Sequence, residues 1–361
     1  MNITITRSQL FFLIVKTQIG IGLLSLPSKT QSTAKGDAWI SVLVAGAVIQ
    51  LLLLVYWHLN KRFPNHNLRQ MTIRIFGSFP GKAVNLLYYG SFIAVAGYAS
   101  ALFIHLIQNW LLPLTPGWVL LLLFLSTSVY LALDNLRVIA RFFVLSSVLL
   151  GLLILLSLAT FAHGPHISNI LPVGHSGVGQ IFRGSENTFF TMLGFEVILY
   201  FFAQVEGNPA GLLKIVTLSN GFVTLFNAYF VFICLIGFSS IAIEQVNEPV
   251  IFLFKGLPNP LFDRLDLIFL TIWSIPMTTT IVAYLCLAGK SVTKSQSAYR
   301  RMVWISGALV FALGAFLSTL ENLDVFGKWM EYEYLFMIAA LPLLMWLISF
   351  LIKNDDRRGT A

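Results

Sequence analysis

The sequence is poor in charge. Only 11% of its 361 residues are Asp, Glu, Lys or Arg, whereas a soluble domain carries about 25%. Hydrophobic residues make up 57% of the chain, Phe alone occurs 31 times, and the mean hydropathy is +0.82. This composition excludes a soluble enzyme. It is typical of a membrane protein with several spans, because each span takes roughly 20 apolar residues.

Sequence motifs for catalysis, metal binding and nucleotide binding are also missing. The two cysteines, Cys234 and Cys286, lie inside apolar runs, which indicates small buried residues and no disulfide framework. The chain has neither a nucleotide-binding loop nor a nucleophile elbow. We therefore expect no enzymatic activity, no cofactor and no metal.

Ten apolar segments are long enough to cross a bilayer, and they leave no room for a sizeable soluble domain. They cover residues 9–32, 38–59, 83–112, 116–133, 141–163, 186–206, 215–238, 265–288, 302–320 and 334–352. The N-terminus lacks the small-residue cleavage pattern of a signal peptide, so the first segment is interpreted as a retained span. The sequence predicts an all-α, multi-pass membrane protein with a single polytopic domain over residues 1–361.

The basic residues are distributed unevenly between the predicted loops. If the N-terminus is cytoplasmic, sixteen of the 23 Lys and Arg residues lie on the cytoplasmic side and six lie outside, with Lys16 inside the first span. Cytoplasmic loops are rich in Lys and Arg, so ten spans with both termini cytoplasmic are predicted. This orientation accounts for the net charge of +8, and no nucleic-acid partner is indicated.

Two loops are longer than the others, residues 60–82 and residues 239–264. They follow the second and the seventh spans and are predicted on opposite sides of the membrane. A five-plus-five inverted repeat produces such a pattern. The predicted halves are residues 9–163 and 186–352, although no residue-level repeat is visible. The first loop is basic, and a short helix at the membrane interface is expected there.

The first span contains the strongest chemical signal. Gly20 and Gly22 weaken the helix at mid-membrane depth, and Pro27 removes a backbone donor. Irregular backbone at that depth is tolerated only where it faces protein or a water-filled cavity. Amides at the start of the following half-helix, from Gly22 to Leu24, could bind an anion such as an α-carboxylate. Close helix packing through small residues is the commoner explanation of a lone G-x-G pair.

The sixth span carries Glu196 near its middle, next to Gly194. Placing a carboxylate at the bilayer centre costs roughly several kcal/mol of free energy, unless it faces a cavity or a partner. Lys16 in the first span is the candidate partner for an intramembrane charge pair. A protonated or backbone-bonded Glu196 that locks the bundle is an equally open alternative.

Two further spans offer polar side chains. Thr280 and Tyr284 in the eighth span are four residues apart and share one helix face. They could line a pocket, although interhelical hydrogen bonding explains them as well. Tyr98, Ala101 and His105 lie over about two turns of the third span. A lone His in a span is more often a satisfied core residue than a proton relay.

The sequence resembles a known family at these positions. Gln9, the run Thr17 to Gly22 and the run Leu24 to Pro27 resemble the start of the B subunits of spore germinant receptors, and so does the LGFE stretch from Leu193 to Glu196. That family is similar to the amino acid–polyamine–organocation transporters. The resemblance implies discontinuous first and sixth helices, the inner membrane of a spore, and a complex with an A subunit and a C subunit.

The resemblance also implies a ligand pocket between the two discontinuous helices. Its expected lining from the first and sixth spans is Gly20, Ile21, Gly22, Leu23, Gly194, Phe195 and Glu196. Its expected lining from the eighth and third spans is Thr280, Tyr284, Tyr98 and Ala101. Lys16 and Glu196 are expected beside the cavity.

The predicted function is a nutrient-sensing receptor subunit that binds a small germinant, an amino acid in the first instance, and triggers germination and ion release. The alternative is a proton-coupled amino acid permease, which needs the same cavity. A purely structural scaffold is a third class, and it would tolerate loss of Glu196. Uptake of the ligand distinguishes the receptor from the permease.

Overall fold

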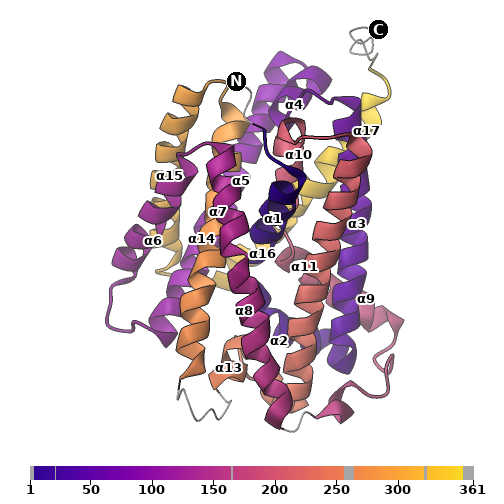
Figure 1. The fold of residues 1–361 in the computed structure, drawn as a ribbon, viewed down its shortest axis with the longest axis vertical. Coiled ribbons are helices and arrows are strands. Elements are labelled where there is room, and N and C mark those ends of the chain that lie inside the picture. The colour runs from indigo at the N-terminus through magenta and orange to yellow at the C-terminus, as the bar shows by residue number, and fades with distance from the viewer. Residues whose placement is uncertain (1–3, 21, 164–165, 256–263, 321–322, 353–361) are drawn as a thin grey trace.

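The protein is a bundle of helices long enough to cross a membrane. A computed structural model describes residues 4–20, 22–163, 166–255, 264–320 and 323–352. Within these ranges the regular structure is helical, apart from one isolated parallel bridge between Ile5 and Val205. Seven described helical segments have the length and apolar composition of a membrane span. The chain is therefore a multi-pass membrane protein, and Figure 1 shows its long helices running side by side.

Six helices run without a break through the segments predicted from sequence. They are α3 (Ala38–Arg62), α5 (Ser78–Trp110), α6 (Gly117–Ala132), α11 (Pro209–Gly237), α14 (Leu265–Val292) and α15 (Gln296–Leu317). The helix α6 has 16 residues and is shorter than the other five. Their sequences are apolar on nearly every face, as expected of helices that contact both protein and lipid.

Two further segments are helical with local changes of geometry. The predicted fifth span is built by α7 (Leu136–Ser146), α8 (Val148–Ser157) and the 3-10 turn η2 (Leu158–His163). The last span begins earlier than predicted, with α16 (Leu323–Leu335), and continues through a π-helical turn, η5 (Phe336–Ala340), into α17 (Leu341–Ser349). A π turn inside a helix is rare and is often found at functional sites.

The first and the sixth predicted segments are each split into two helices. The first contains α1 (Arg7–Gln18) and α2 (Gly22–Ala34), and Ile19 after α1 has extended backbone geometry. The interruption predicted at Gly20 and Gly22 is therefore confirmed. The sixth contains α9 (Val178–Thr191), α10 (Val197–Phe201) and the short turn η4 (Phe202–Gln204).

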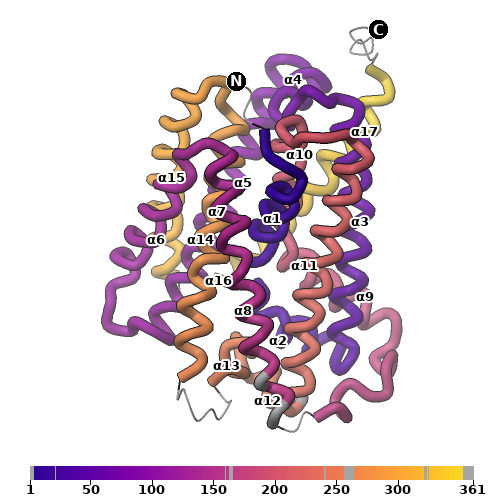
Figure 2. Tube along the Cα trace, in the orientation of Figure 1, coloured from indigo at the N-terminus to yellow at the C-terminus, as the bar shows by residue number. Residues whose placement is uncertain are grey.

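Short helices occupy the two long loops at opposite ends of the bundle. The helix α4 (Leu68–Phe76) follows α3, and it is capped by Asn67 and Gln70. The helices α12 (Ser240–Glu244) and α13 (Pro249–Lys255) follow α11, while residues 256–263 lie outside the described residues. The tube in Figure 2 shows α4 near one end of the bundle and α12 and α13 near the other.

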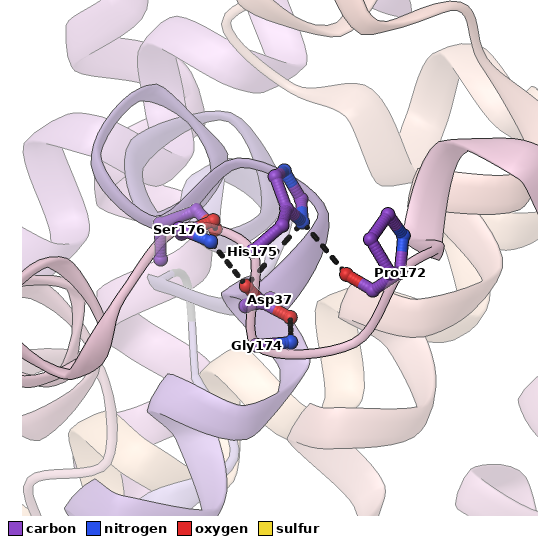
Figure 3. A network of polar contacts seen from close by, with 6 residues as sticks. Asp37, Pro172, Gly174, His175 and Ser176 are labelled. Carbon is purple, nitrogen blue, oxygen red and sulfur yellow. Dashed lines mark hydrogen bonds and ion pairs between the residues drawn. The ribbon is translucent and has the colours of Figure 1, made fainter.

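A buried carboxylate that sequence reasoning missed joins two segments of the chain at one end of the bundle. Asp37, in the turn η1 (Lys35–Asp37) before α3, is fully buried. It accepts hydrogen bonds from the backbone N–H groups of Gly174 (2.7 Å) and Ser176 (2.9 Å). Its Oδ2 also lies 3.5 Å from Nδ1 of His175, as Figure 3 shows. These contacts attach the loop before α9, which includes η3 (Ile167–Ile170), to the start of α3.

Candidate functional site

The break in the first helix is supported by hydroxyl groups from α14. Thr280 Oγ1 lies 3.3 Å from the carbonyl oxygen of Lys16 and 3.4 Å from that of Ile19. Thr279 Oγ1 lies 3.3 Å from the same Lys16 carbonyl. Both hydroxyls also reach the Pro276 carbonyl within α14, at 2.8 Å for Thr279 and 3.1 Å for Thr280. The last carbonyls of a helix have no intrahelical partner, so a buried helix end needs such donors. Thr280 therefore lies at the first break.

The break in the sixth helix lies directly against the first. The side-chain amide of Gln18 donates to the carbonyl of Met192 at 2.8 Å. Gly194 has a φ of +120°, and a Cβ atom there would be 2.7 Å from the carbonyl carbon and oxygen of Thr17. Only glycine satisfies both the backbone geometry and the close approach. The two breaks thus form one continuous region of irregular backbone.

The glycines of the first break have different surroundings. A Cβ atom on Gly22 would be 2.9 Å from Cγ2 of Thr191 and 3.2 Å from its Cα, so Gly22 permits close packing of α2 on α9. A Cβ on Gly20 would make an ordinary contact of 3.4 Å with Thr280 Oγ1. Leu23 is buried, and Ile21 lies outside the described residues.

Glu196 is the buried charge of this region. Its side chain is 1% exposed, Oε2 accepts from the backbone N–H of Gly194 at 3.0 Å, and Oε1 accepts from the Tyr334 hydroxyl. The ring of Tyr284 lies 6.4 Å from that of Tyr334. The carboxylate is therefore held by its own backbone and by the Tyr334 hydroxyl.

Further tyrosines bind the π-helical turn that follows Tyr334. Tyr88 donates its hydroxyl to the carbonyl of Met337 at 2.8 Å, and Tyr56 donates to the carbonyl of Ile338. A π turn disturbs the regular i→i−4 bonding, so its carbonyls are available to outside donors. Phe92 packs between this group and α10, with ring centroids 5.9 Å from Tyr88 and 5.7 Å from Tyr200.

Sequence reasoning missed most of this tyrosine group. Tyr56, Tyr88, Tyr200 and Tyr334 are almost fully buried, and none was singled out. A buried tyrosine usually finds a partner for its hydroxyl, so tyrosines inside otherwise apolar spans are the signal that could have found them. Two polar atoms here, the Tyr200 hydroxyl and Gln18 Oε1, are buried with no hydrogen-bond partner in the described structure.

Lys16 and Glu196 do not form the expected charge pair, because each side chain has a different partner. Lys16 is fully buried, and its Nζ lies 3.4 Å from the carbonyl oxygen of Ser146, near the junction of α7 and α8. Glu196 is bound instead by Gly194 and Tyr334. The side chain of Lys16 leaves α1 toward α7, because α1 packs between α7 on one side and α14 on another.

The third-span residue Tyr98 packs against α16, with its ring 5.9 Å from that of Phe326 and its hydroxyl beside Gly327. Ala101 is fully buried further along α5. The residues of α5 that reach the Glu196 group are Tyr88 and Phe92, the latter 6.2 Å from the Tyr284 ring. No sequence motif fixes the register of this helix, and the place of Tyr98 and Ala101 in the pocket lining stays a prediction.

Described residues of the first, sixth and eighth spans lie close to one another at the two breaks. Phe195 is fully buried, 5.8 Å from the ring of Tyr56 and 6.3 Å from that of Phe189. Backbone amides and carbonyls at two breaks, one carboxylate and several hydroxyls can bind both ends of a small zwitterion. Among the described residues, no group of three or more His, Cys, Asp and Glu gathers to bind a metal ion.

Comparisons with solved structures agree with this geometry. The structure of MhsT in complex with L-phenylalanine matches with a TM-score of 0.70 and 13% identity, over 95% of this chain and 88% of that one. The nucleobase-cation-symport transporter Mhp1 matches with a TM-score of 0.69 and 14% identity, over 96% of this chain and 78% of the other. At this identity the likeness shows a transporter-type fold.

Comparisons of sequence give the family. The spore germination protein YndE of Bacillus subtilis is 23% identical over 98% of both chains, and GerQB of Bacillus cereus is 20% identical over 94% of both. The family model described as spore germination protein matches residues 4–324. With both breaks, the buried Glu196 and this match in view, the chain belongs to the spore germination protein family and is of the germinant receptor B type.

Proposed function

We propose that this chain is the nutrient-sensing subunit of a spore germinant receptor and binds a small germinant, an amino acid in the first instance, between the two helix breaks. One observation carries the proposal. In a chain of this family, the two breaks touch each other through Gln18 and Gly194, directly beside the buried carboxylate of Glu196.

The polar groups at the breaks suit the two ends of an amino acid. The α-carboxylate would bind amides at the N-terminus of α2, from Gly22 onward, where the helix dipole favours an anion. The α-ammonium would bind Glu196, with Tyr284 and Tyr334 as neighbours. Gly20, Ile21, Leu23, Gly194, Phe195 and Thr280 would surround it, with Tyr98 and Ala101 of α5 as the proposed lining from the third span.

Ligand binding would shift the balance between two arrangements of the bundle. In the structure described, Glu196 is bonded to Tyr334 and the Thr280 hydroxyl lies against the Lys16 carbonyl. A ligand that takes over some of these groups favours the arrangement in which they are free to bind it. That shift would pass to partner subunits and lead to ion release.

The architecture proposed for this function is a ten-span, five-plus-five inverted repeat, with halves at residues 9–163 and 186–352. The positions of the broken helices and of the short helices support this architecture. Each half would begin with a broken helix, and the short helices α4 and α13 each follow the second span of their half at opposite ends of the bundle.

The proposed setting is the inner membrane of a spore, with both termini cytoplasmic and with A and C subunits as partners in the lipid bilayer. Its support is the set of curated relatives, which are spore germination proteins of Bacillus subtilis and Bacillus cereus. The excess of Lys and Arg in the predicted cytoplasmic segments supports the orientation.

Binding and uptake measured on one preparation test the proposal. The purified chain is screened against amino acids by thermal shift, and any hit is followed as labelled uptake into vesicles, with and without a proton gradient. Saturable binding without accumulation is expected. Thr280→Val should weaken binding, whereas Thr278→Val, which removes a hydroxyl bonded only within α14, should not. Accumulation of the labelled ligand driven by the proton gradient would overturn the receptor proposal and support a permease.

A further inference from the structure

A second polar site lies away from the helix breaks, in a cavity of about 50 Å³ between α7, η4, α14 and α15. Its polar and charged lining comes from Asp134, Asn135, Gln204, Lys290, Gln296 and Tyr299. One water needs roughly 10–15 Å³ of such volume. The cavity therefore has room for about three to five waters or for one small ion.

Lys290 supplies a positive charge to this cavity. Its Nζ lies 3.3 Å from Oε1 of Gln204, 5.1 Å from the ring centroid of Phe201 and 5.9 Å from that of Tyr299. None of the ion pairs among the described residues includes Lys290. An ammonium group has three donors, and the amide oxygen of Gln204 takes one of them.

Two helices also begin at the cavity. Leu136 is the first residue of α7 and Gln296 is the first residue of α15, and both line it. Helices of 11 and 22 residues place the positive ends of their dipoles there. One first-turn amide of each is already capped, Val138 N–H by the Asn135 side chain and Ala298 N–H by the Ser295 side chain. Two features of the cavity disfavour an anion. They are the C-terminal turn of α14, which contains Lys290, and the carboxylate of Asp134. That carboxylate is turned to its neighbour, because Oδ1 accepts from the Asn135 backbone at 2.7 Å and from its side chain at 3.2 Å.

We propose that this cavity binds a small monovalent anion, of the size of chloride or formate, with Lys290 as its charged ligand. The site is separate from the germinant pocket and does not depend on the proposed receptor function. It lies beside the N-terminal segment, because the carbonyl of Gln204 accepts from the N–H of Ile5 at 2.9 Å and Glu206 N–H donates back to Ile5 at 3.0 Å.

Chloride itself is the probe. The excess ³⁵Cl line width of the purified full-length chain is measured against chloride concentration, with gluconate keeping the ionic strength constant. A saturable excess is expected, and formate should remove it by competition, whereas the larger gluconate should not. Lys290→Met should weaken binding by about tenfold or more, since a hydrogen bond to a charged group contributes about 1.5–3 kcal/mol.

Two further variants make the test specific. Lys214→Met removes an exposed lysine from α11 and should leave the chloride titration unchanged. Asp134→Asn removes the opposing charge and should tighten binding severalfold, a gain that damage to the fold does not produce. A line width that rises without saturation, unchanged binding in Lys290→Met, or no tightening in Asp134→Asn would each overturn the site.

Discussion

The two helix breaks are supported in different ways. The first break depends on a neighbour, because Thr279 and Thr280 of α14 contact the carbonyls at the end of α1. The sixth break also uses its own backbone, with Gly194 at a positive φ and its N–H bonded to Glu196 two residues later, beside the contacts from Gln18 and Tyr334. We call the sixth break the rigid side, because Gly194 leaves no space for a Cβ atom, and the first break the adjustable side, because Gly20 does.

The largest effect is expected where the rigid side is broken. Gly194→Ala puts a Cβ atom 2.7 Å from the Thr17 backbone at a φ of +120°, so a loss of about 2–5 kcal/mol of stability is expected. Gly20→Ala is the matched variant on the adjustable side, where the new atom has ordinary space. Thermal unfolding of the purified variants checks this. Equal losses in both would contradict the contrast between the breaks.

A smaller effect is expected when the Glu196 carboxylate loses a donor. Tyr334→Phe removes a hydroxyl that is bonded to Glu196 in a buried setting, so a loss of about 1–3 kcal/mol is expected. Tyr332→Phe removes a hydroxyl from a side chain that is 76% exposed and serves as the control. Chemical denaturation in detergent compares the pair, and an unchanged Tyr334→Phe would mean that Glu196 is held by its backbone contact alone.

The support from α14 should be weaker than either of these. Thr280→Val removes the hydroxyl next to the carbonyls of Lys16 and Ile19. A cost of about 1 kcal/mol is expected, because hydrogen bonds between helices in membranes are modest. Thr280→Ser keeps the hydroxyl and should restore the melting temperature. If Thr280→Ser and Thr280→Val lower the melting temperature equally, the hydroxyl does not support the first break.

The smallest effect is the coupling between the two buried charges. Lys16 and Glu196 have different partners, so the effects of Lys16→Met and Glu196→Gln on stability should add to within about 0.5 kcal/mol. A double-mutant cycle measures this directly. A larger favourable coupling energy would mean that Lys16 and Glu196 interact as the charge pair predicted from the sequence.

The sequence predicted the parts of the molecule that depend on local chemistry. The apolar segments follow from hydropathy, and seven described helical segments have the length and composition of a span. The break at Gly20 and Gly22 agrees with the glycine content, and α1 and α2 are separate helices. Helical spacing places Thr280 and Tyr284 on one helix face, and Thr280 lies at the first break.

The parts that depend on contacts between distant segments could not be predicted. The direction of the Lys16 side chain, the register of α5 and the role of Tyr334 are set by which helices pack together. Asp37 likewise binds the backbone of residues 174 and 176, far along the chain. No local pattern carries that information in a single sequence.

Protection of an introduced cysteine tests the central claim most directly, namely that the germinant is held between the two breaks. Both native cysteines are buried, so a thiol reagent reports on Gly20→Cys at the first break and on the exposed Lys29→Cys as control. An amino acid that binds the chain should slow labelling at position 20 in a saturable manner and leave position 29 unchanged. Unchanged labelling at position 20, with binding to that variant intact, would contradict the account.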